Sequence, residues 1–258
     1  MPVASLAERV GRVPLWYHTL ELPHGVTTPG WFDHRPVVER MPWPDVKGAR
    51  CLDIGTYDGF FAFELERRGA SEVVALDIAE HADWEWAPRQ RDDGPRVLAA
   101  MAGAKGEGFL VAKEALQSRV ERVLGSVYDL SPAHLGTFDV VVCGSLLLHL
   151  QDPVGALGAI RGICRGTLLS AEAIDPNLTS LGSRRALARF DGTDGRWWIP
   201  SRIGHERMLV SAGFTIEKTV EPYVIPPGSG YPAAGASARP FAEDSARLHA
   251  AVLCAPVR

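Results

Sequence analysis

The sequence has little of what several protein classes require. It contains four cysteines in 258 residues and no C-x-x-C pair, so we do not expect a structural zinc site. Its longest apolar run, residues 140–150, contains glycine, serine and histidine and is too short to cross a bilayer. Glu8 and Arg9 stand where a secretion signal would need an apolar stretch. These absences favour a soluble cytoplasmic protein that makes no contact with a membrane.

An excess of positive charge is also missing. The chain has 27 Lys and Arg against 31 Asp and Glu, a formal net charge of −4, which argues against a surface that coats nucleic acid. Residues 183–207 are locally basic, with six arginines among aromatic side chains. Such a strip would suit RNA, an anionic small molecule or a solvated helix face, and the sequence leaves these alternatives open.

The composition that remains is that of a folded globular protein, with 46% apolar and 22% charged residues. From residue 49 onward, short apolar runs alternate with segments of helical spacing. The runs predict strands at 49–55, 71–78, 120–124, 138–145, 166–173, 215–220 and 249–257. The other segments predict helices at 60–70, 108–119, 152–163 and 201–212. This order is typical of an α/β protein with a doubly wound, Rossmann-like, mostly parallel sheet of seven strands.

Three segments fall outside the alternation. Residues 1–48 precede the first strand, are rich in Trp, Pro and His, and predict an N-terminal lid segment ahead of a core domain at 49–258. Residues 174–200 form an insert after the fifth strand and are a second candidate for covering the site. Residues 225–244 are rich in Pro, Gly, Ala and Ser and predict a mobile surface loop.

The strongest local signal is the loop at residues 53–59, DIGTYDG, which we call the glycine loop. It joins the first predicted core strand to the first predicted core helix. Gly55 lets the backbone turn tightly and approach a ligand, and Gly59 lets the helix begin close to the sheet. The helix N-terminus then favours an anionic group such as a carboxylate. Asp77, at the end of the second strand, suits two hydrogen bonds to ribose hydroxyls. These features predict a nucleoside site, although a purely structural turn would use the same glycines.

Nicotinamide-dependent enzymes share this geometry, but their G-x-G-x-x-G loop cradles a pyrophosphate. Here Tyr57 stands at the second glycine position and Asp58 follows it. A tyrosine and a carboxylate fit poorly against a pyrophosphate. The loop therefore disfavours a nicotinamide-dependent oxidoreductase.

The acid-x-Gly start of the loop resembles motif I of the class I S-adenosylmethionine (SAM) methyltransferases, whose ligand is a nucleoside that carries an amino acid. Further segments match in the same order: residues 125–130 after the third strand, 138–145 in the fourth, and LLLHLQDP at 146–153, which resembles the family's L-H-x-x-D-P run. The resemblance implies that SAM is the cofactor. It assigns cofactor contacts to Asp53, Gly55, Thr56, Tyr57, Gly59, Asp77, Ile78, Ser126, Val127 and Gly144.

The flanking segments are similar to a smaller group, the methyltransferases related to the bacterial tRNA wobble-uridine carboxymethyltransferase. The similar blocks are residues 16–18, 28–33, 197–201 and 212–214. The similarity implies that the N-terminal segment folds over the cofactor and helps to form the substrate pocket.

The chain departs from that group at the side chains that hold the extra carboxylate of its carboxy-SAM cofactor. A tryptophan-arginine-lysine run is replaced by WYH at residues 16–18, a tyrosine by Leu148 and an arginine by Ala250. An unpaired buried carboxylate would cost several kcal/mol, so plain SAM is the expected cofactor.

Methyl transfer depends mainly on positioning, and a general base is needed chiefly when the acceptor is a hydroxyl. His149, past the fourth strand, and His18, in the lid segment, are the catalytic candidates, although either could instead anchor a loop or pack in the core. Residues 143–145 (CGS) offer none of the ligands that metal-dependent catechol methyltransferases carry there, so no metal is expected. The candidates for substrate contact are Tyr17, Trp31, Phe32, Trp197 and Trp198, each of which could equally be packing.

The leading interpretation is a SAM-dependent methyltransferase that acts on a small molecule, with specialised metabolism as one setting. The alternatives are a tRNA-modifying methyltransferase and a SAM-binding protein without catalysis. The acceptor atom, the substrate and the oligomeric state stay open at this stage.

Overall fold

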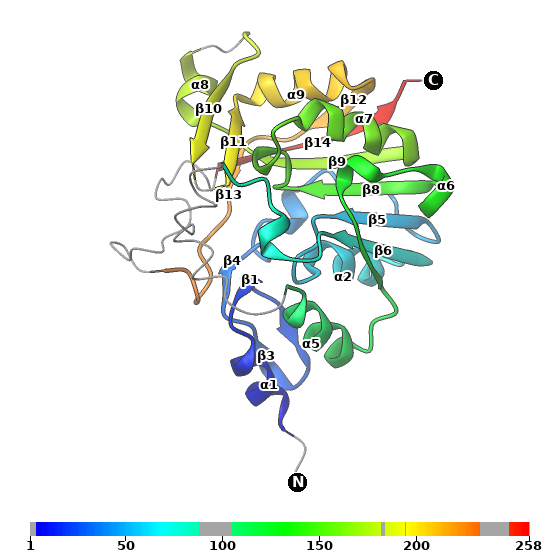
Figure 1. The fold of residues 1–258 in the computed structure, drawn as a ribbon, viewed down its shortest axis with the longest axis vertical. Coiled ribbons are helices and arrows are strands. Elements are labelled where there is room, and N and C mark those ends of the chain that lie inside the picture. Colours follow the sequence, from blue (N-terminus) through cyan, green and yellow to red (C-terminus); the bar gives the residue numbers. More distant parts are fainter. Residues whose placement is uncertain (1–3, 88–104, 182–183, 194, 233–247, 258) are drawn as a thin grey trace.

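The computed structural model describes residues 4–87, 105–181, 184–193, 195–232 and 248–257. A single large sheet forms its centre (Figure 1). Along the sheet the strands follow the order β12 (Phe214–Thr219), β14 (Leu248–Pro256), β9 (Cys164–Ala173), β8 (Phe138–Gly144), β5 (Arg50–Ile54), β6 (Glu72–Asp77) and β7 (Glu121–Leu124). The short strand β13 (Tyr223–Val224) pairs with β14 beside this path and adds an eighth strand to the seven that were predicted.

The pairing explains why the sheet is doubly wound. Strands β9, β8, β5, β6 and β7 run parallel to their neighbours, and β14 is antiparallel to both β9 and β12. The chain starts at the central strand β5, moves outward through β6 and β7, and returns to the other side of β5 with β8. The carboxyl ends of β5 and β8 therefore flank the switch point, where ligands bind in such sheets. The predicted α/β class and mostly parallel sheet are confirmed.

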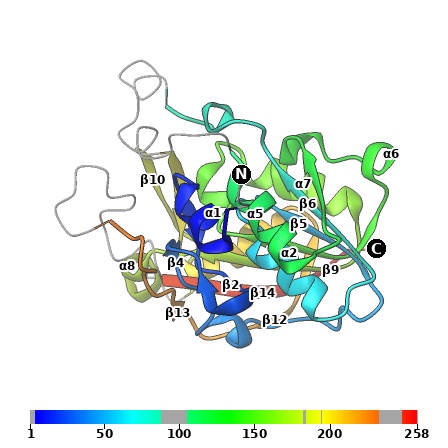
Figure 2. The ribbon, with the colours of Figure 1, turned by 90° about the horizontal axis from the view of Figure 1, so that it is seen from below.

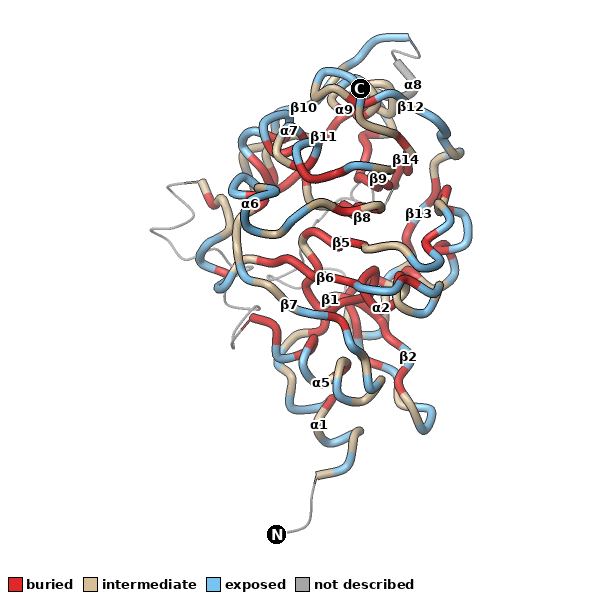
Figure 3. The backbone as a smooth tube through the Cα atoms, turned by 90° about the vertical axis from the view of Figure 1, so that its right-hand side faces the viewer, coloured by how far each residue is buried: buried red, intermediate tan, exposed pale blue. Residues whose placement is uncertain are grey.

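Two apolar clusters cover the faces of the sheet. Helices α2 (Phe60–Arg67) and α5 (Glu107–Leu116) pack on one face, and α7 (Pro153–Ile163) and α9 (Arg202–Ser211) pack on the other. Alternate residues of β8 serve the two sides, since Val140 and Val142 belong to the first cluster and Val141 and Cys143 to the second. Figure 3 shows the buried backbone concentrated in these central strands. The remaining helices are α1 (Leu6–Arg12), α6 (Pro132–Leu135) and α8 (Pro176–Leu181).

The N-terminal segment is built into the core rather than attached to it. Strands β1 (Trp16–His18) and β4 (Gly30–Phe32) form a parallel pair, and β2 (Glu21–Leu22) and β3 (Val26–Thr27) form a short hairpin. Trp16 and Trp31 are buried in the same cluster as the phenylalanines of α2. Figure 2 shows α1 of this segment beside α5, in agreement with the contacts between the two helices.

A carboxylate from the glycine loop pins this segment in place. The Asp58 side chain accepts hydrogen bonds from the backbone N–H groups of Tyr17 (2.5 Å) and His18 (2.8 Å). Asp58 is buried, so its two hydrogen bonds satisfy groups that water does not reach. The end of the loop at 53–59 and strand β1 of the N-terminal segment are thus tied directly to each other.

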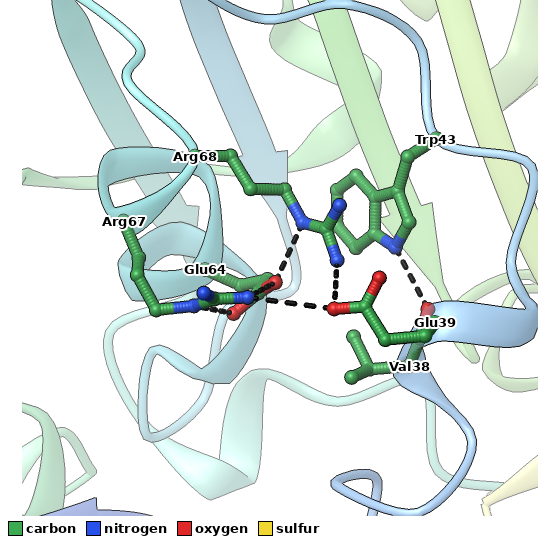
Figure 4. Close-up of polar contacts among 6 residues, drawn as sticks. All are labelled: Val38, Glu39, Trp43, Glu64, Arg67 and Arg68. Carbon is green, nitrogen blue, oxygen red and sulfur yellow. Dashed lines mark hydrogen bonds and ion pairs between the residues drawn. The ribbon is translucent and has the colours of Figure 1, made fainter.

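A network of ion pairs lies at the outer edge of the contact between α2 and the N-terminal segment (Figure 4). Arg68, at the end of α2, lies 2.6 Å from Glu39 of the N-terminal segment and 2.6 Å from Glu64. Its guanidinium also lies over the ring of Trp43, 4.4 Å from the centroid. Surface ion pairs contribute roughly 0–1 kcal/mol, so the buried apolar contact and the Asp58 hydrogen bonds are the stronger attachment.

The insert at 174–200 contains a hairpin that the sequence analysis did not predict. Strands β10 (Ala188–Thr193) and β11 (Arg196–Pro200) pair antiparallel, with Phe190 opposite Trp198. The indole N–H of Trp197 donates to the Glu85 carbonyl (2.6 Å) and that of Trp198 to the Gln151 carbonyl (3.1 Å). These bonds join the hairpin to the segments after β6 and β8.

The segment predicted as a mobile loop is in part a structural contact. The Pro226 carbonyl accepts from Asp33 N–H (3.0 Å), and Gly228 N–H donates to the Trp31 carbonyl (2.8 Å). Residues 226–230 therefore hydrogen-bond to β4 and the residue after it, and the mobility of the segment stays a prediction. Residues 233–244 lie outside the described part of the chain. No helix in the described residues combines the length and the apolar character that crossing a membrane requires.

Candidate functional site

Two hollows lie at the carboxyl ends of β5, β6 and β8, on either side of the loop that follows β8. The first is lined by Ile54, Gly55, Leu76, Asp77, Ile78, Trp84, Gly125, Val127 and Leu146. The second is lined by Tyr17, His18, Phe32, His34, Gly144, Ser145, Leu148, His149, Ala173, Ile225 and His249. Gly144 and Ser145 line the second hollow, and Leu146, the next residue, lines the first. A ligand that fills the first hollow therefore lies next to the second.

The two glycines singled out from the sequence are required by the backbone of the first hollow. Gly55 has a φ of 75°, and a Cβ there would lie 3.4 Å from the side chain of Leu146. Gly59 has a φ of 91°, and a Cβ there would lie 2.5 Å from the ring of Phe63. The loop can therefore turn from β5 into α2 while it leaves the hollow open.

Asp77 lies at the mouth of the first hollow with its carboxylate already held. One oxygen accepts from the backbone N–H of Tyr57 (3.0 Å) and the other from that of Ile78 (2.9 Å). The Nζ of Lys105 lies 2.8 Å from the first oxygen, and both side chains are buried. Lys105 was missed from the sequence, because it comes 28 positions after Asp77 in a stretch without periodicity.

Tyr57 occupies a loop position at which glycine is usual, and its contacts hold it there. Its φ is 48°, a left-handed conformation that is unfavourable for a side chain of this size. Lys105 Nζ lies 4.0 Å from the centre of the Tyr57 ring, and the Tyr57 hydroxyl lies 2.9 Å from Nε2 of His81. The backbone bond to Asp77 and these side-chain contacts together hold the strained residue in place.

Asp53 and Thr56 are buried polar side chains of the loop at 53–59, and they line neither hollow. Burial raises the pKa of Asp53 to about 7, against the effects of the Thr56 hydroxyl and the Ala62 backbone N–H. Burial also raises the pKa of Asp58 to about 7, against the effect of its two backbone hydrogen bonds.

The second hollow is surrounded by four buried histidines. His18 and His34 come from the N-terminal segment, His149 from the loop after β8 and His249 from β14. Burial lowers the pKa of His18 to about 3 and that of His149 to about 4, so both imidazoles are neutral at pH 7. The ring of Tyr17 lies 5.0 Å from that of Phe32, between this hollow and the glycine loop. The hollow is therefore lined by aromatic rings and by imidazole nitrogens that can form hydrogen bonds.

Of the two catalytic candidates, His149 has contacts that anchor a loop. Its Nδ1 lies 2.7 Å from the Gly195 carbonyl, and its ring stacks on Trp84 at 4.9 Å. Trp84 also lines the first hollow and was missed from the sequence as a site residue. His18 faces the second hollow, and its backbone is the one pinned by Asp58. Catalytic roles for His18 and His149 stay predictions.

Glu172, on β9, holds the loop between the hollows. Its Oε1 accepts from the backbone N–H groups of Leu146 (2.9 Å) and Leu147 (3.0 Å). Burial raises the pKa of this carboxyl to about 8. No local spacing marks Glu172 in the sequence, since its partners lie in the loop that follows β8.

The remaining residues that were predicted to contact the cofactor or the substrate are divided between the two hollows and the structure around them. Val127, Ile78 and Gly55 line the first hollow, whereas Gly144 lines the second, and their contacts with the cofactor stay predictions. The Ser126 hydroxyl caps the turn that follows by accepting from Tyr128 N–H (3.2 Å). Tyr17 and Phe32 line the second hollow. Trp31, Trp197 and Trp198 are not among its lining residues, and the two indoles of the insert make the backbone bonds described above.

Comparison with known proteins identifies the family. A family model described as a methyltransferase domain matches residues 34–219, most of the chain. The chain belongs to the methyltransferase domain family. The predicted family is confirmed, and with it SAM as the cofactor.

Individual relatives of this methyltransferase are distant. A ubiquinone biosynthesis O-methyltransferase of Neisseria meningitidis is 28% identical over 47% of this chain and 42% of its own length. A tRNA U34 carboxymethyltransferase of Ectopseudomonas mendocina is 24% identical over 70% of this chain and 49% of its own length. The chain thus spans less than half the length of these two curated relatives.

Solved structures agree with the fold. The N-terminal domain of EvdMO1, crystallised in the presence of S-adenosylhomocysteine and D-fucose, matches with a TM-score of 0.55 and 17% identity, over 98% of this chain and 96% of that one. A putative SAM-dependent methyltransferase of Listeria monocytogenes matches with a TM-score of 0.51 and 16% identity, over 85% of this chain and 96% of that one.

The first hollow fits the parts of SAM. Apolar side chains (Ile54, Leu76, Ile78, Val127 and Leu146) and the Trp84 ring offer a slot for a flat base, and Asp77 stands where ribose hydroxyls would be held. Asp53 and Thr56 belong to the loop at 53–59 but line neither hollow, so their contact with the amino-acid part stays a prediction. In the described residues of this methyltransferase, no three His, Cys, Asp or Glu side chains are grouped to hold a metal ion. Metal independence stays a prediction.

Proposed function

We propose that this methyltransferase moves a methyl group from SAM to a compact small-molecule acceptor bound in the second hollow. The observation that carries the proposal is the lining of the hollow, which combines the rings of Tyr17 and Phe32 with buried imidazoles. Sites lined by apolar and aromatic side chains with a few polar groups take small molecules. The N-terminal segment closes one side of the hollow, with Tyr17, His18, Phe32 and His34.

The reaction asks the protein mainly to position two molecules. SAM, when bound, supplies a methyl group on a sulfonium that is ready for displacement. Asp77 would hold the ribose, and residues 53–59 would hold the amino-acid part. The loop at 144–146, kept in place by Glu172, sets where the first hollow meets the second. Orientation of this kind is worth roughly 7–11 kcal/mol of the barrier.

The residues around the second hollow would exclude water and align the acceptor. Tyr17 and Phe32 offer ring faces for an apolar or aromatic body. The neutral imidazoles of His18 and His149 offer hydrogen bonds without charge. We also propose that the N-terminal segment acts as a lid, because the same residues that wall the hollow are tied to the cofactor loop through Asp58.

A tRNA acceptor is the second candidate, because a tRNA-modifying enzyme is among the relatives. It would need arginines free to bind phosphates. In the basic strip at 183–207, Arg189 pairs with Asp175 (2.9 Å), Arg196 with Asp191 (3.2 Å) and Arg202 with Glu206 (2.7 Å). These internal pairs reduce the positive charge that the strip offers to RNA. They favour the small-molecule acceptor.

The deciding experiment uses SAM that carries a labelled methyl group. The protein is incubated with this SAM and, in parallel, with bulk tRNA or with a cell extract filtered to remove protein and RNA. We expect label in a compound of the filtered extract and none in the tRNA. Label in the tRNA alone would overturn the proposal. Calorimetric binding of S-adenosylhomocysteine without transfer to either fraction would instead support a non-catalytic SAM-binding protein.

A further inference from the structure

Ser145 and His249 form a hydrogen-bonded pair in the wall of the second hollow. Ser145 Oγ lies 2.6 Å from Nε2 of His249, and both residues line the hollow. Ser145 is the residue that follows β8, and Leu146 after it lines the cofactor hollow. The pair thus stands beside the wall that the two hollows share.

The backbone of Ser145 adopts a strained, left-handed conformation, in which its hydroxyl lies against His249. Its φ is 53°, and its N–H donates to the Ala171 carbonyl at 2.7 Å. A non-glycine residue in this conformation is costly, and such residues are concentrated at functional sites. Glu172 satisfies the N–H groups of Leu146 and Leu147, the next two residues of the loop.

His249 places a ring nitrogen against a serine hydroxyl in the wall of the hollow. His149 is bonded to a backbone carbonyl and stacked on Trp84. His249 is buried on β14, with the ring of Tyr223 stacked on it at 6.2 Å. Its titratable neighbours from other elements are His34 of the N-terminal segment and His205 of α9, and His249 acts electrostatically on both of them.

We propose that Ser145 and His249 act as a proton relay for an acceptor that presents a hydroxyl group, so that the product is a methyl ether or ester. This inference rests on the proposed function and names the acceptor class for the same site. A hydroxyl is the acceptor that most needs a base, because its oxygen must lose a proton as it is methylated. A neutral imidazole that is hydrogen-bonded to a serine hydroxyl can act as this base through the hydroxyl.

The proton and electron balance of the step is simple. The acceptor oxygen forms a bond to the methyl carbon, and the carbon–sulfur bond breaks with its electron pair going to sulfur. The acceptor O–H gives its proton to Ser145 Oγ while the Ser145 proton moves to Nε2 of His249. The imidazolium then returns that proton to solvent, and the pair is restored. Nε2 must therefore be the unprotonated nitrogen of the resting imidazole.

The tautomer of His249 tests the relay without any acceptor. Nitrogen-15 NMR of the full-length, histidine-labelled protein, saturated with S-adenosylhomocysteine, distinguishes protonated from unprotonated ring nitrogens. His249→Gln assigns the signals, and Ser145→Ala should shift the Nε2 signal because its hydrogen-bond partner is lost. We expect Nε2 to be unprotonated at neutral pH. A proton resident on Nε2 would overturn the relay, because the imidazole would then donate to Ser145.

The chain provides a matched control for the transfer assay. Ser170 and His205 form a second serine–histidine pair, 2.9 Å apart and fully buried, which does not line the hollow. With the unmethylated precursor of the labelled extract product as acceptor, Ser145→Ala and His249→Gln should each lower kcat by about 10²–10⁴-fold. Ser170→Ala should leave kcat within about twofold of the wild type, because this pair does not line the hollow, although the loss of a buried hydrogen bond lowers the stability.

The product and the pH profile complete the test. A label on oxygen, and a kcat that rises with pH in the wild type but loses this acid limb in His249→Gln, would support the relay. A label on nitrogen or carbon, or an unchanged kcat in Ser145→Ala, would overturn it. If the proposed function itself is wrong, no compound of the extract takes label from the wild type or from any variant. The tautomer of His249 then still shows whether the pair can accept a proton.

Discussion

Asp77 is the residue on which the cofactor assignment depends most closely. Its carboxylate already accepts two backbone hydrogen bonds and faces the ammonium of Lys105 at 2.8 Å. This arrangement orients the oxygens before a ribose arrives, so little has to be reorganised when SAM binds. Lys105 also balances one of the three buried carboxylates of the region, Asp53, Asp58 and Asp77.

Asp77→Asn should therefore weaken the binding of S-adenosylhomocysteine by about 1–3 kcal/mol, because a charge-assisted hydrogen bond becomes a neutral one. Isothermal titration calorimetry measures the change directly. Asp45→Asn is the control, since Asp45 is an exposed acid outside both hollows. An unchanged dissociation constant for Asp77→Asn would show that this carboxylate does not hold the ribose.

Among the elements, the N-terminal segment and the glycine loop behave as one unit. Trp16, Trp31 and Phe32 share an apolar cluster with α2, and Asp58 links the two backbones. Removal of residues 1–48 would thus expose the apolar side of α2, which makes a truncation a poor test of the lid. A point substitution at the pin is sharper.

Asp58→Ala should loosen the segment, because the buried N–H groups of Tyr17 and His18 lose their acceptor. An unsatisfied buried donor costs about 1–3 kcal/mol. Hydrogen–deuterium exchange should then rise at 16–32, the stretch from β1 to β4, more than in the β5–β8 centre of the sheet. Asp58→Asn keeps an acceptor oxygen and should change exchange less. Equal exchange in Asp58→Ala and the wild type would mean that the pin does not hold the segment.

The elements of the core could be predicted from the sequence because their signals are local. Apolar runs, the glycine loop and the proline and Asp caps of α7 all act over a few residues. The second hollow could not be assembled in the same way. His34, Glu172 and His249 come from three distant parts of the chain, and none stands in a spacing that marks it. Only the pairing of β14 with β9 brings the last two to the same edge of the sheet.

For the whole molecule, the buried ionisable groups predict how stability depends on pH. Burial raises the pKa of Asp53 and Asp58 to about 7 and that of Glu172 to about 8. The folded protein therefore keeps protons that the unfolded chain has already lost, and these groups lower the stability as pH rises. The histidines act oppositely: His18 and His149, with lowered pKa values, cost stability as pH falls below the unfolded value.

The two effects oppose each other below about pH 6.5, and only the carboxyl groups act between about pH 6.5 and 8. We expect the melting temperature of the protein without cofactor to fall across that interval. Differential scanning calorimetry at constant ionic strength measures it, and Glu172→Gln should flatten the fall at the alkaline end. A melting temperature that rises toward pH 8 would contradict the burial of these carboxyl groups in the folded state.

The central claim is that the two hollows are one active site, with SAM in the first and the acceptor in the second. A crystal structure of the full chain with S-adenosylhomocysteine tests this most directly. The account predicts the adenosine between Asp77 and Val127, and the sulfur at the opening toward Ser145 and Tyr17. A sulfur that faces away from that hollow, or an adenosine bound elsewhere on the molecule, would contradict it.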